Sequence, residues 1–173
     1  KLQVLDLMEK LRIPKPDRVF QQYPHQLSGG LKQRIVIAMG LCTNPRLLIA
    51  DEPTTALDVT VQAQIMRLFK EMTVDKGIGL FLITHDLGVI AQVCDKVAVM
   101  YAGNMVEFGK IETLFNTPRH PYTKALLECI PYIGMKKGTL NAISGSVPST
   151  ATYPSGCRYH PRCPHSEPQC ENE

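Results

Sequence analysis

The chain has 173 residues, of which 44% are hydrophobic and 20% charged, and these proportions exclude wholesale disorder. Its net charge of +3 is too small to indicate a nucleic-acid partner on electrostatic grounds alone. No apolar run approaches the roughly 18 residues that a membrane span needs. The chain starts without a signal peptide and without an initiator methionine, so we expect a piece of a longer protein.

The first half of the chain predicts helices that alternate with short buried strands. Apolar residues at helical spacing indicate a helix over 1–13, and a longer apolar helix begins at Ser28. The apolar run 46–50 is typical of a strand buried on both faces, and so is the run 80–84. Asp58 is placed to cap the helix between these strands. The strand–helix–strand order predicts an α/β layered core.

The second half predicts a hairpin, short helices and an irregular tail. Residues 131–173 are rich in Pro, Gly, Ser and Cys and contain few apolar runs. The predicted elements before this tail are strands over 96–101 and 105–108, joined by a Gly-Asn turn, and helices over 111–115 and 122–129.

A candidate anion site lies in segment 27–34, which reads Leu-Ser-Gly-Gly-Leu-Lys-Gln-Arg. A serine at a helix start with two glycines behind it leaves backbone N–H groups uncovered, and these groups attract anions together with the helix dipole. Lys32 and Arg34 lie in the first turns, where the dipole disfavours positive charge, so an external anion would complete the site. For this segment alone, an ordinary capped helix behind a Gly-rich loop is an equally good interpretation.

Acidic residues and a histidine follow the two predicted strands. Asp51 and Glu52 come directly after the first strand, and His85 ends the second. Ligands of open α/β sheets bind outside the carboxyl ends of the strands. One carboxylate can hold Mg²⁺ there, and the other can deprotonate an attacking water. His85 would reach the same edge and could stabilise a transferring phosphoryl group. Taken singly, a solvated turn and a structural histidine are the commoner interpretations.

Together these segments resemble the ATP-binding cassette (ABC) ATPase family. Segment 27–34 resembles the LSGGQ signature, with leucine in place of the usual glutamine, and segment 47–52 resembles the Walker B motif. Segment 55–58 resembles the D-loop, and His85 matches the switch histidine. The resemblance implies an α/β fold: a partial RecA-like P-loop NTPase core with the end of the helical subdomain and an irregular C-terminal extension.

The resemblance also implies cofactors and roles. ATP and Mg²⁺ are the expected cofactors, with Glu52 as catalytic base, His85 as the second catalytic residue and Asp51 as the Mg²⁺ ligand. The implied nucleotide-binding residues are Ser28, Gly29, Gly30, Lys32, Gln33, Asp51 and Asp58. The chain contains no G-x-x-x-x-G-K-[ST] phosphate loop. In this family ATP lies between two subunits, so the signature is expected to serve the site opposite to that of Glu52.

The C-terminal part narrows the resemblance to ATPases of dipeptide, oligopeptide or nickel importers. Segments 120–127, 145–148 and 156–164 resemble the extension that follows the cassette in that subfamily. We predict three parts, which are the end of the helical subdomain over 1–45, the second half of the ATPase core over 46–115 and the importer-type extension over 116–173.

The leading hypothesis is an ATP-hydrolysing, energy-coupling subunit of a bacterial ABC importer for peptides, peripheral on the cytoplasmic face of the plasma membrane. Its expected partners are a second ATPase subunit, identical or paralogous, and transmembrane permease subunits. An extracytoplasmic solute-binding protein is an indirect partner, and no nucleic acid is expected. The alternatives are a soluble ABC ATPase without a transport role and a metal-binding interaction module built on a degenerate cassette.

Three cysteines sit singly among apolar residues, namely Cys42, Cys94 and Cys129. We expect them to be small core residues in a reducing compartment.

The other three cysteines, Cys157, Cys163 and Cys170, cluster in a tail that has few large apolar side chains to offset its ordering entropy. We therefore predict that their sulfur atoms converge on one point. Members of the resembled subfamily are thought to carry an iron–sulfur cluster, so these residues are candidate ligands of a [4Fe–4S] cluster in a longer chain. Zinc, with His160 or His165 as a further ligand, and three free thiols are the alternatives.

Overall fold

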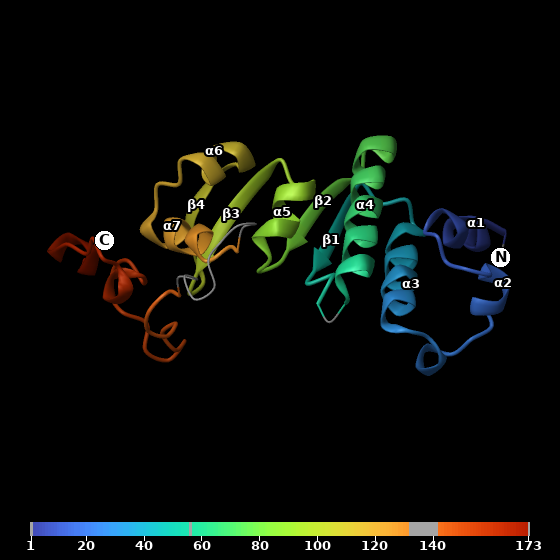
Figure 1. Ribbon diagram of the computed structural model, residues 1–173, viewed down its shortest axis with the longest axis horizontal. Helices are drawn as coiled ribbons and strands as arrows, with labels where there is room; N and C mark the ends of the chain where they lie inside the picture. The colour runs from blue at the N-terminus through green and yellow to red at the C-terminus, as the bar shows by residue number, and fades with distance from the viewer. Residues whose placement is uncertain (1, 56, 132–141, 173) are drawn as a thin grey trace. The chain divides into compact units, whose positions relative to one another are not determined.

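The computed structural model describes residues 2–55, 57–131 and 142–172. The chain divides into two compact units, residues 1–93 and residues 94–173, whose elements are labelled in Figure 1. In the described ranges no helix is long and apolar enough to cross a membrane. The predicted division into 1–45, 46–115 and 116–173 describes subdomains of the resembled family, not compact units of the structure. It stays a prediction.

The first unit consists of helices around a parallel pair of strands. Its long helices begin where the sequence predicts. The Ser28 hydroxyl accepts a hydrogen bond from the N–H of Leu31, and the Asp58 carboxylate accepts one from the N–H of Val61, so both residues act as N-caps. The elements are α1 (Leu2–Lys10), α2 (Pro16–Val19), the 3₁₀ turn η1 (Pro24–Gln26), α3 (Gly29–Leu41), β1 (Leu47–Asp51), α4 (Val59–Lys76), β2 (Gly79–Ile83) and α5 (Leu87–Val93).

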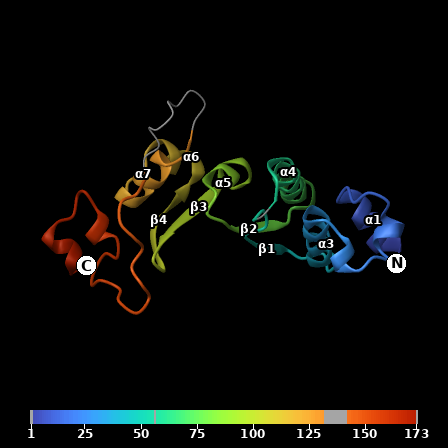
Figure 2. The same cartoon turned by 60° about the horizontal axis from the view of Figure 1, so that its bottom comes forward.

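Strands β1 and β2 pair in parallel from Leu47 opposite Gly79 to Asp51 opposite Ile83. Helix α4 makes the crossover between them and lies along one side of the pair (Figures 1 and 2). The side chains that face the core are those of Leu48, Ala50, Leu80 and Leu82. On the opposite face Ile49 is 64% exposed and Phe81 57% exposed. The prediction of strands buried on both faces is therefore wrong for one face, because the helices packed against this unit's described strands cover only the other.

The core of the first unit is organised around α4. This helix contributes Ile65, Met66 and Phe69, which are almost fully buried, and α1 is followed by the fully buried Leu11. Phe69 lies four positions after Ile65 and three after Met66, which places all three on the face of α4 that meets the other elements. Because α4 packs against both the strands and the N-terminal helices, it holds the end of β1 and the start of α3 within the same unit.

The second unit begins with an antiparallel hairpin. Ala102 and Gly103 have φ of 47° and 86°, and positive φ at both central residues is the mark of a type I′ turn. The turn therefore lies one residue earlier than the Gly-Asn turn predicted from the sequence. The elements are β3 (Lys96–Tyr101), β4 (Asn104–Lys110), α6 (Ile111–Asn116), α7 (Pro121–Glu128) and the 3₁₀ turns η2 (His160–Arg162) and η3 (Pro168–Glu171).

A carboxylate ties α7 to the hairpin of the second unit. Glu107 on β4 accepts hydrogen bonds from the N–H groups of Arg119 (2.9 Å) and His120 (3.0 Å). Burial raises the pKa of Glu107, but the Thr123 side chain and these two N–H donors outweigh burial and hold the pKa below its usual value. The buried Thr123 hydroxyl has no partner at normal hydrogen-bond distance among the described residues, so the hydrogen bonds that hold the Glu107 carboxylate are those from Arg119 and His120.

Tyrosine packing anchors the tail of the second unit. The Tyr159 ring is only 2% exposed, and its centroid lies 5.1 Å from that of Tyr101 and 5.3 Å from that of Tyr122. Tilted ring pairs at these distances add to the free energy gained by burying the rings. The partners come from β3 and α7, so the tail is packed against elements far from it in sequence.

Two arginines complete this attachment. Arg162 donates hydrogen bonds to the carbonyl oxygens of Ser144 (2.7 Å) and Ile143 (3.0 Å) and to the Tyr101 hydroxyl (3.1 Å). Arg158 donates to the carbonyl oxygen of Ala102 and lies over a tyrosine ring. The expectation that the tail lacks the contacts to hold one shape is thus wrong, because its few aromatic side chains pack against aromatic partners outside the tail.

Candidate functional site

The candidate catalytic acid lies just past the end of β1. Glu52 has φ of 45°, an uncommon value for a residue with a side chain. Its N–H donates to the carbonyl oxygen of Ile83 at 2.9 Å, which continues the pairing of β1 with β2 by one residue. Backbone strain of this kind collects at functional sites, where the surrounding structure holds it. Here it turns the Glu52 side chain toward the loop after β2.

The Glu52 carboxylate is held by two side chains. His85 Nδ1 lies 2.8 Å from Glu52 Oε1, and the Thr55 hydroxyl donates to Glu52 Oε2 at 2.7 Å. The hydrogen bond from His85, followed by that from Thr55, holds the pKa of Glu52 below its usual value, and the same bond raises the pKa of His85. The carboxylate is therefore ionised at neutral pH, which is the state that can accept a proton from water.

The loop that carries His85 is itself positioned by Asp86. The Asp86 carboxylate accepts from the N–H groups of Gly88 (2.9 Å) and Val89 (3.2 Å), and so caps α5. Its other oxygen accepts from Gln62 Nε2 on α4 at 3.0 Å. The His85 loop is thereby attached to the helix that follows the D-loop segment.

Asp51 is the last residue of β1, and its side chain is exposed. Mg²⁺ sites in phosphate-handling proteins use one or two carboxylates together with substrate phosphates and water. In the part of the chain that the structure describes, no three His, Cys, Asp or Glu side chains group so that they could hold a metal ion by themselves. The exposed Asp51 carboxylate is the kind of oxygen donor that suits Mg²⁺ bound together with a nucleotide.

The signature residues lie in a separate groove. A groove of about 640 Å³ is lined by Ser28, Gly29, Gly30 and Asp58, together with residues of α3 and α4. The structure thus brings together four of the predicted nucleotide-binding residues. Neither Lys32 nor Gln33 is among the described residues that line this groove. The first N–H groups of α3 have no partner within the helix, so an anion could be bound at its N-terminus.

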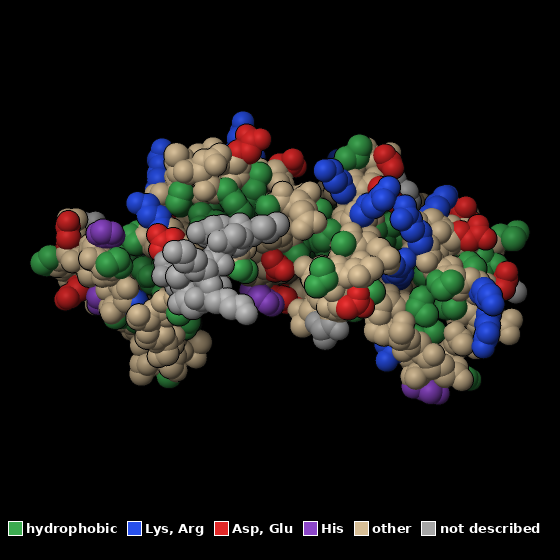
Figure 3. Space-filling view, viewed as in Figure 1, with side chains coloured by type: hydrophobic (Ala, Val, Ile, Leu, Met, Phe, Trp, Pro, Cys, Tyr) green, Lys and Arg blue, Asp and Glu red, His purple; other side chains and the backbone are tan. Residues whose placement is uncertain are grey.

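Arg34 has a role that the sequence did not indicate. The sequence leaves open whether Arg34 serves an anion site or an ordinary capped helix. In the structure its guanidinium donates to the carbonyl oxygens of Leu11 (3.0 Å) and Arg12 (3.1 Å), just past the end of α1. Arg12 and Arg67 both contact Glu71 of α4, and basic side chains gather over α1 and α4 in Figure 3. Arg34 and Arg12 therefore connect separate helical segments of the chain, whereas Arg67 pairs within α4.

The tail cysteines do not form the predicted metal site. The N–H of Cys157 donates to the carbonyl oxygen of Cys170 at 2.9 Å, which closes the backbone of this segment into a loop. The sulfur atoms of Cys157, Cys163 and Cys170 nevertheless form no group that could hold a metal, as judged over the described residues. The prediction that they converge on one point is wrong, because ring packing and arginine hydrogen bonds shape the tail.

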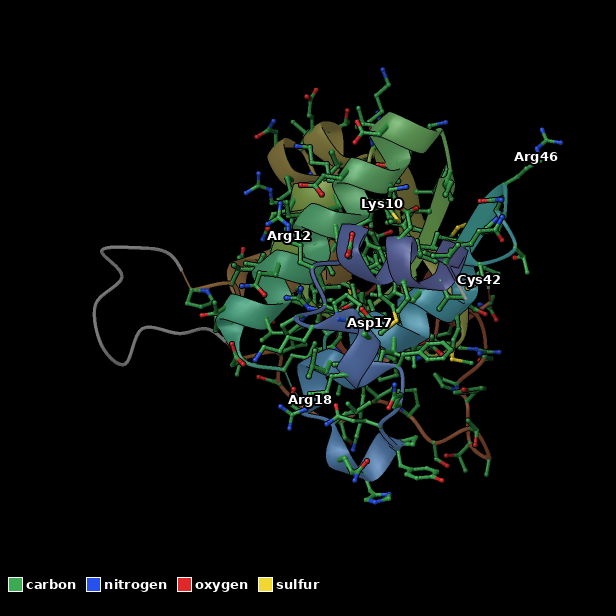
Figure 4. All side chains as sticks on the ribbon, turned by 90° about the vertical axis from the view of Figure 1, so that its right-hand side faces the viewer. Lys10, Arg12, Asp17, Arg18, Cys42 and Arg46 are labelled. Carbon is green, nitrogen blue, oxygen red and sulfur yellow. The ribbon has the colours of Figure 1, made fainter. Side chains whose placement is uncertain are left out.

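The three remaining cysteines also differ from expectation. Cys42 caps the C-terminal end of α3 and is exposed (Figure 4), so it is not a core residue. Cys94 and Cys129 are half-buried. Burial, with a smaller effect from the neighbouring Asp95, raises the pKa of the Cys94 thiol, which makes it a poor nucleophile.

Two residues of this site were not predicted. Thr55 contacts the Glu52 carboxylate directly, and Gln62 supports the His85 loop through Asp86. The position of Thr55, three residues after Glu52, is a signal that turn geometry could have supplied, since such a hydroxyl can reach back across one turn. No signal in the sequence marks Gln62, because its partner is 24 residues away.

Comparison with protein families matches both ends of the chain. Residues 1–55 match the family described as "ABC transporter". Residues 106–170 match the family described as "Oligopeptide/dipeptide transporter, C-terminal region". The first match includes Ser28, Gly29, Gly30 and Glu52, and the second includes Tyr122 and Tyr159.

Curated relatives align with almost all of the chain. It is 51% identical to the dipeptide transport ATP-binding protein DppD of Bacillus subtilis over 98% of the chain and 50% of the relative. It is 48% identical to DppD of Escherichia coli, over 98% of the chain and 52% of the relative. The oligopeptide transport ATP-binding protein AppD of Bacillus subtilis is 48% identical, over 96% and 51% respectively. The chain thus spans about half the length of these relatives.

Solved structures agree with the fold. The dimeric structure of MJ0796, a bacterial ABC transporter cassette, superposes with a TM-score of 0.56 at 30% identity, over 63% of this chain and 46% of that one. A post-hydrolysis state of the same cassette, bound to ADP and Pi, gives a TM-score of 0.57. The fold is a partial RecA-like ABC fold, as predicted. In its sequence, its fold and its C-terminal region, the chain is thus similar to the ATP-binding proteins of ABC transporters over nearly all of its length.

Proposed function

We propose that this chain is part of an ATP-hydrolysing subunit that drives an ABC importer for peptides. The observation that carries the proposal is the Glu52 carboxylate at the end of β1, held between His85 and Thr55. The match of residues 106–170 to the C-terminal region of oligopeptide/dipeptide transporters favours transport of peptides over a soluble ABC ATPase without a transport role.

The proposed roles follow from the chemistry of each group. Glu52, kept ionised by His85, accepts a proton from the water that attacks the terminal phosphate. His85 is largely exposed and stands beside that carboxylate, where it orients Glu52 and stabilises charge that develops on the transferring group. When bound, Mg²⁺ neutralises phosphate charge, and Asp51 is the residue that would hold it.

The groove at the start of α3 is the proposed contact for the nucleotide of the opposite subunit. Ser28, Gly29 and Gly30 would present N–H groups and a hydroxyl to phosphate oxygens there, with Asp58 at its edge and Lys32 and Gln33 in the following turn. A second ATPase subunit, identical or paralogous, is thus a required partner.

The remaining partners and the location belong to the same proposal. Transmembrane permease subunits would receive the motion of the ATPase pair, and an extracytoplasmic solute-binding protein would deliver peptide. The subunit would act peripherally on the cytoplasmic face of the plasma membrane. An iron–sulfur cluster or zinc at the tail cysteines is not part of this proposal, because their donor atoms are not grouped for it.

The test uses the full-length protein assembled with its permease partners in liposomes. We expect ATP hydrolysis that rises when peptide and binding protein are supplied, and import of labelled peptide that requires ATP. Glu52→Gln should abolish both activities while leaving the complex assembled. Peptide import that proceeds unchanged with Glu52→Gln in every ATPase subunit would overturn the proposal.

A further inference from the structure

The second glycine of the signature faces another helix of the same chain. A Cβ placed on Gly30 would lie 2.9 Å from Cγ1 of Val61 and 3.5 Å from its Cγ2. Separations below 3.0 Å do not occur between real side chains, so Val61 would have to move. Valine in a helix has one strongly preferred χ1 rotamer, and Val61 lies in the first turn of α4, which leaves it little freedom to turn away.

The neighbouring glycine provides a contrast. A Cβ on Gly29 would meet only Leu57 Cδ2, at 3.8 Å, which is an ordinary contact. Of these two signature glycines, Gly30 is therefore the one that packing against another helix requires to be glycine. At Gly30 the backbone of α3 thus lies directly against the Val61 side chain of α4.

One turn further along α3, Arg34 makes a second connection. Its Nη1 donates to the carbonyl oxygens of Leu11 and Arg12, and its Nη2 donates to Gln64 of α4. Carbonyl groups at a helix end lack partners within the helix and attract a cation. A guanidinium can serve these separated acceptors at once, whereas a lysine ammonium cannot present the same fork.

The Gly30–Val61 contact and the Arg34–Gln64 hydrogen bond lie along the same interface between α3 and α4. Gly30 and Arg34 are four residues apart on α3, and Val61 and Gln64 are three apart on α4, so each pair lies on one face of its helix. We propose that Gly30 and Arg34 are positioning residues: through Val61, Gln64 and the end of α1, they hold the signature residues against the start of α4. The inference rests on the proposed function only where activity is the readout.

A cycle of stability measurements tests the Gly30–Val61 contact directly. Alanine favours helix over glycine, so Gly30→Ala should stabilise α3 unless the contact with Val61 prevents it. In the full-length protein we expect Gly30→Ala to lower Tm by about 2–6 °C, as overpacking does in a domain of this size. On a Val61→Ala background, where the obstructing methyls are absent, the same change should raise Tm or leave it unchanged.

Two matched variants control this cycle. Gly29→Ala, one residue away in the same helix, should not lower Tm. Val74→Ala removes a 73% exposed valine from the same helix α4 and should not reverse the effect of Gly30→Ala. A Gly30→Ala variant that keeps or raises Tm with Val61 present, or an effect that Val61→Ala does not reverse, would refute the contact.

Activity separates a positioning role from a purely structural one. The displaced signature should lower kcat for ATP by tenfold or more in Gly30→Ala, since misplacement by about 1 Å is costly to catalysis, and Val61→Ala should restore most of it. If Val61→Ala restores Tm but not kcat, Gly30 is needed at the nucleotide and not for positioning, and the proposal fails. A wild-type protein without ATPase activity would refute the proposed function, while the Tm cycle would still decide the contact.

Arg34→Lys provides an independent arm. The substitution keeps the positive charge but removes the planar guanidinium that donates several hydrogen bonds at once. We expect kcat for ATP to fall severalfold, with a smaller change in Tm. The matched control is Arg67→Lys. Within the described part of the chain, the ion pair of Arg67 is an exposed i,i+4 pair with Glu71, and such pairs contribute little. Equal kcat for Arg34→Lys and Arg67→Lys would show that the Arg34 connection does not position the signature.

Discussion

Removing the Tyr159 side chain should release the tail from the β3–β4 hairpin. The Tyr159 ring is 2% exposed and packs against the rings of Tyr101 and Tyr122. Truncating a buried aromatic residue to alanine costs about 3–5 kcal/mol, part of which is the loss of two ring pairs at about 0.5–1.5 kcal/mol each. At about 1.4 kcal/mol per factor of ten, the tail of Tyr159→Ala should open roughly 10²- to 4 × 10³-fold more often.

Hydrogen exchange read by mass spectrometry measures this opening. The amides to follow are those of Cys157 and His160, whose N–H groups donate to carbonyl oxygens within the tail. Exchange at these amides should accelerate in Tyr159→Ala, while amides of the first unit remain protected. Tyr23→Ala, which removes a 68% exposed tyrosine, is the matched control and should leave the tail unchanged.

Two results would refute the reasoning. The first is tail exchange in Tyr159→Ala that equals the wild-type rate, because the ring cluster would then not hold the tail. The second is a large acceleration on adding a metal chelator to the wild-type protein. That result would show that a metal at Cys157, Cys163 and Cys170 shapes the tail, contrary to the arrangement of the described donors.

Three further outcomes are expected. Glu52→Gln should lower ATP turnover about 100-fold or more with ATP binding intact, as for loss of a general base. Adding His85→Ala should lower turnover little further, because both groups act on one transition state. Near-normal turnover in Glu52→Gln would exclude Glu52 as the general base. In NMR titrations the His85 pKa should lie above 6.5 and return toward 6.5 in Glu52→Gln. The Glu52–His85 bond should be complete between about pH 4.5 and 6.5. It should weaken as pH rises through the raised pKa of His85 or falls through the lowered pKa of Glu52; a His85 pKa unaffected by Glu52→Gln would contradict the contact. Glu107→Gln should destabilise the second unit by about 1–2 kcal/mol, as for a lost N-terminal cap. Because the Glu107 pKa is lowered, the stability that its carboxylate contributes is present above pH 4.5 and is lost as pH falls through the lowered value. The acid denaturation curves of wild type and Glu107→Gln should therefore converge at low pH. Curves that stay parallel would contradict this stabilising role of the Glu107 carboxylate.

Local signals in the sequence were sufficient for the regular elements. Ser28 and Asp58 cap the helices that they were predicted to begin, since a capping side chain needs only the N–H groups of the next turn. The placement of Glu52 and His85 at one edge was also predictable. Parallel strands bring their carboxyl ends together, and the distance of 2.8 Å between His85 Nδ1 and Glu52 Oε1 confirms that the two side chains are in contact. The resemblance to ABC ATPases followed from the same short motifs and is confirmed by the comparisons.

Contacts between distant segments could not be predicted in this way. The scarcity of large apolar side chains in the tail, together with the family resemblance, suggested a metal site at Cys157, Cys163 and Cys170. In the structure, Tyr159 instead packs against Tyr101 and Tyr122. Likewise, Arg34 lies in the signature but bonds to the end of α1.

The sequence by itself determined the helices, the strands, the order of the motifs and the family. Those depend on interactions within a turn or on residue identity. Only the tertiary structure decided which side chains hold Glu52, which helix Gly30 faces and what attaches the tail. Each of these depends on the close approach of groups that are distant along the chain, and the free energy of such contacts is set by packing geometry, which no local pattern records.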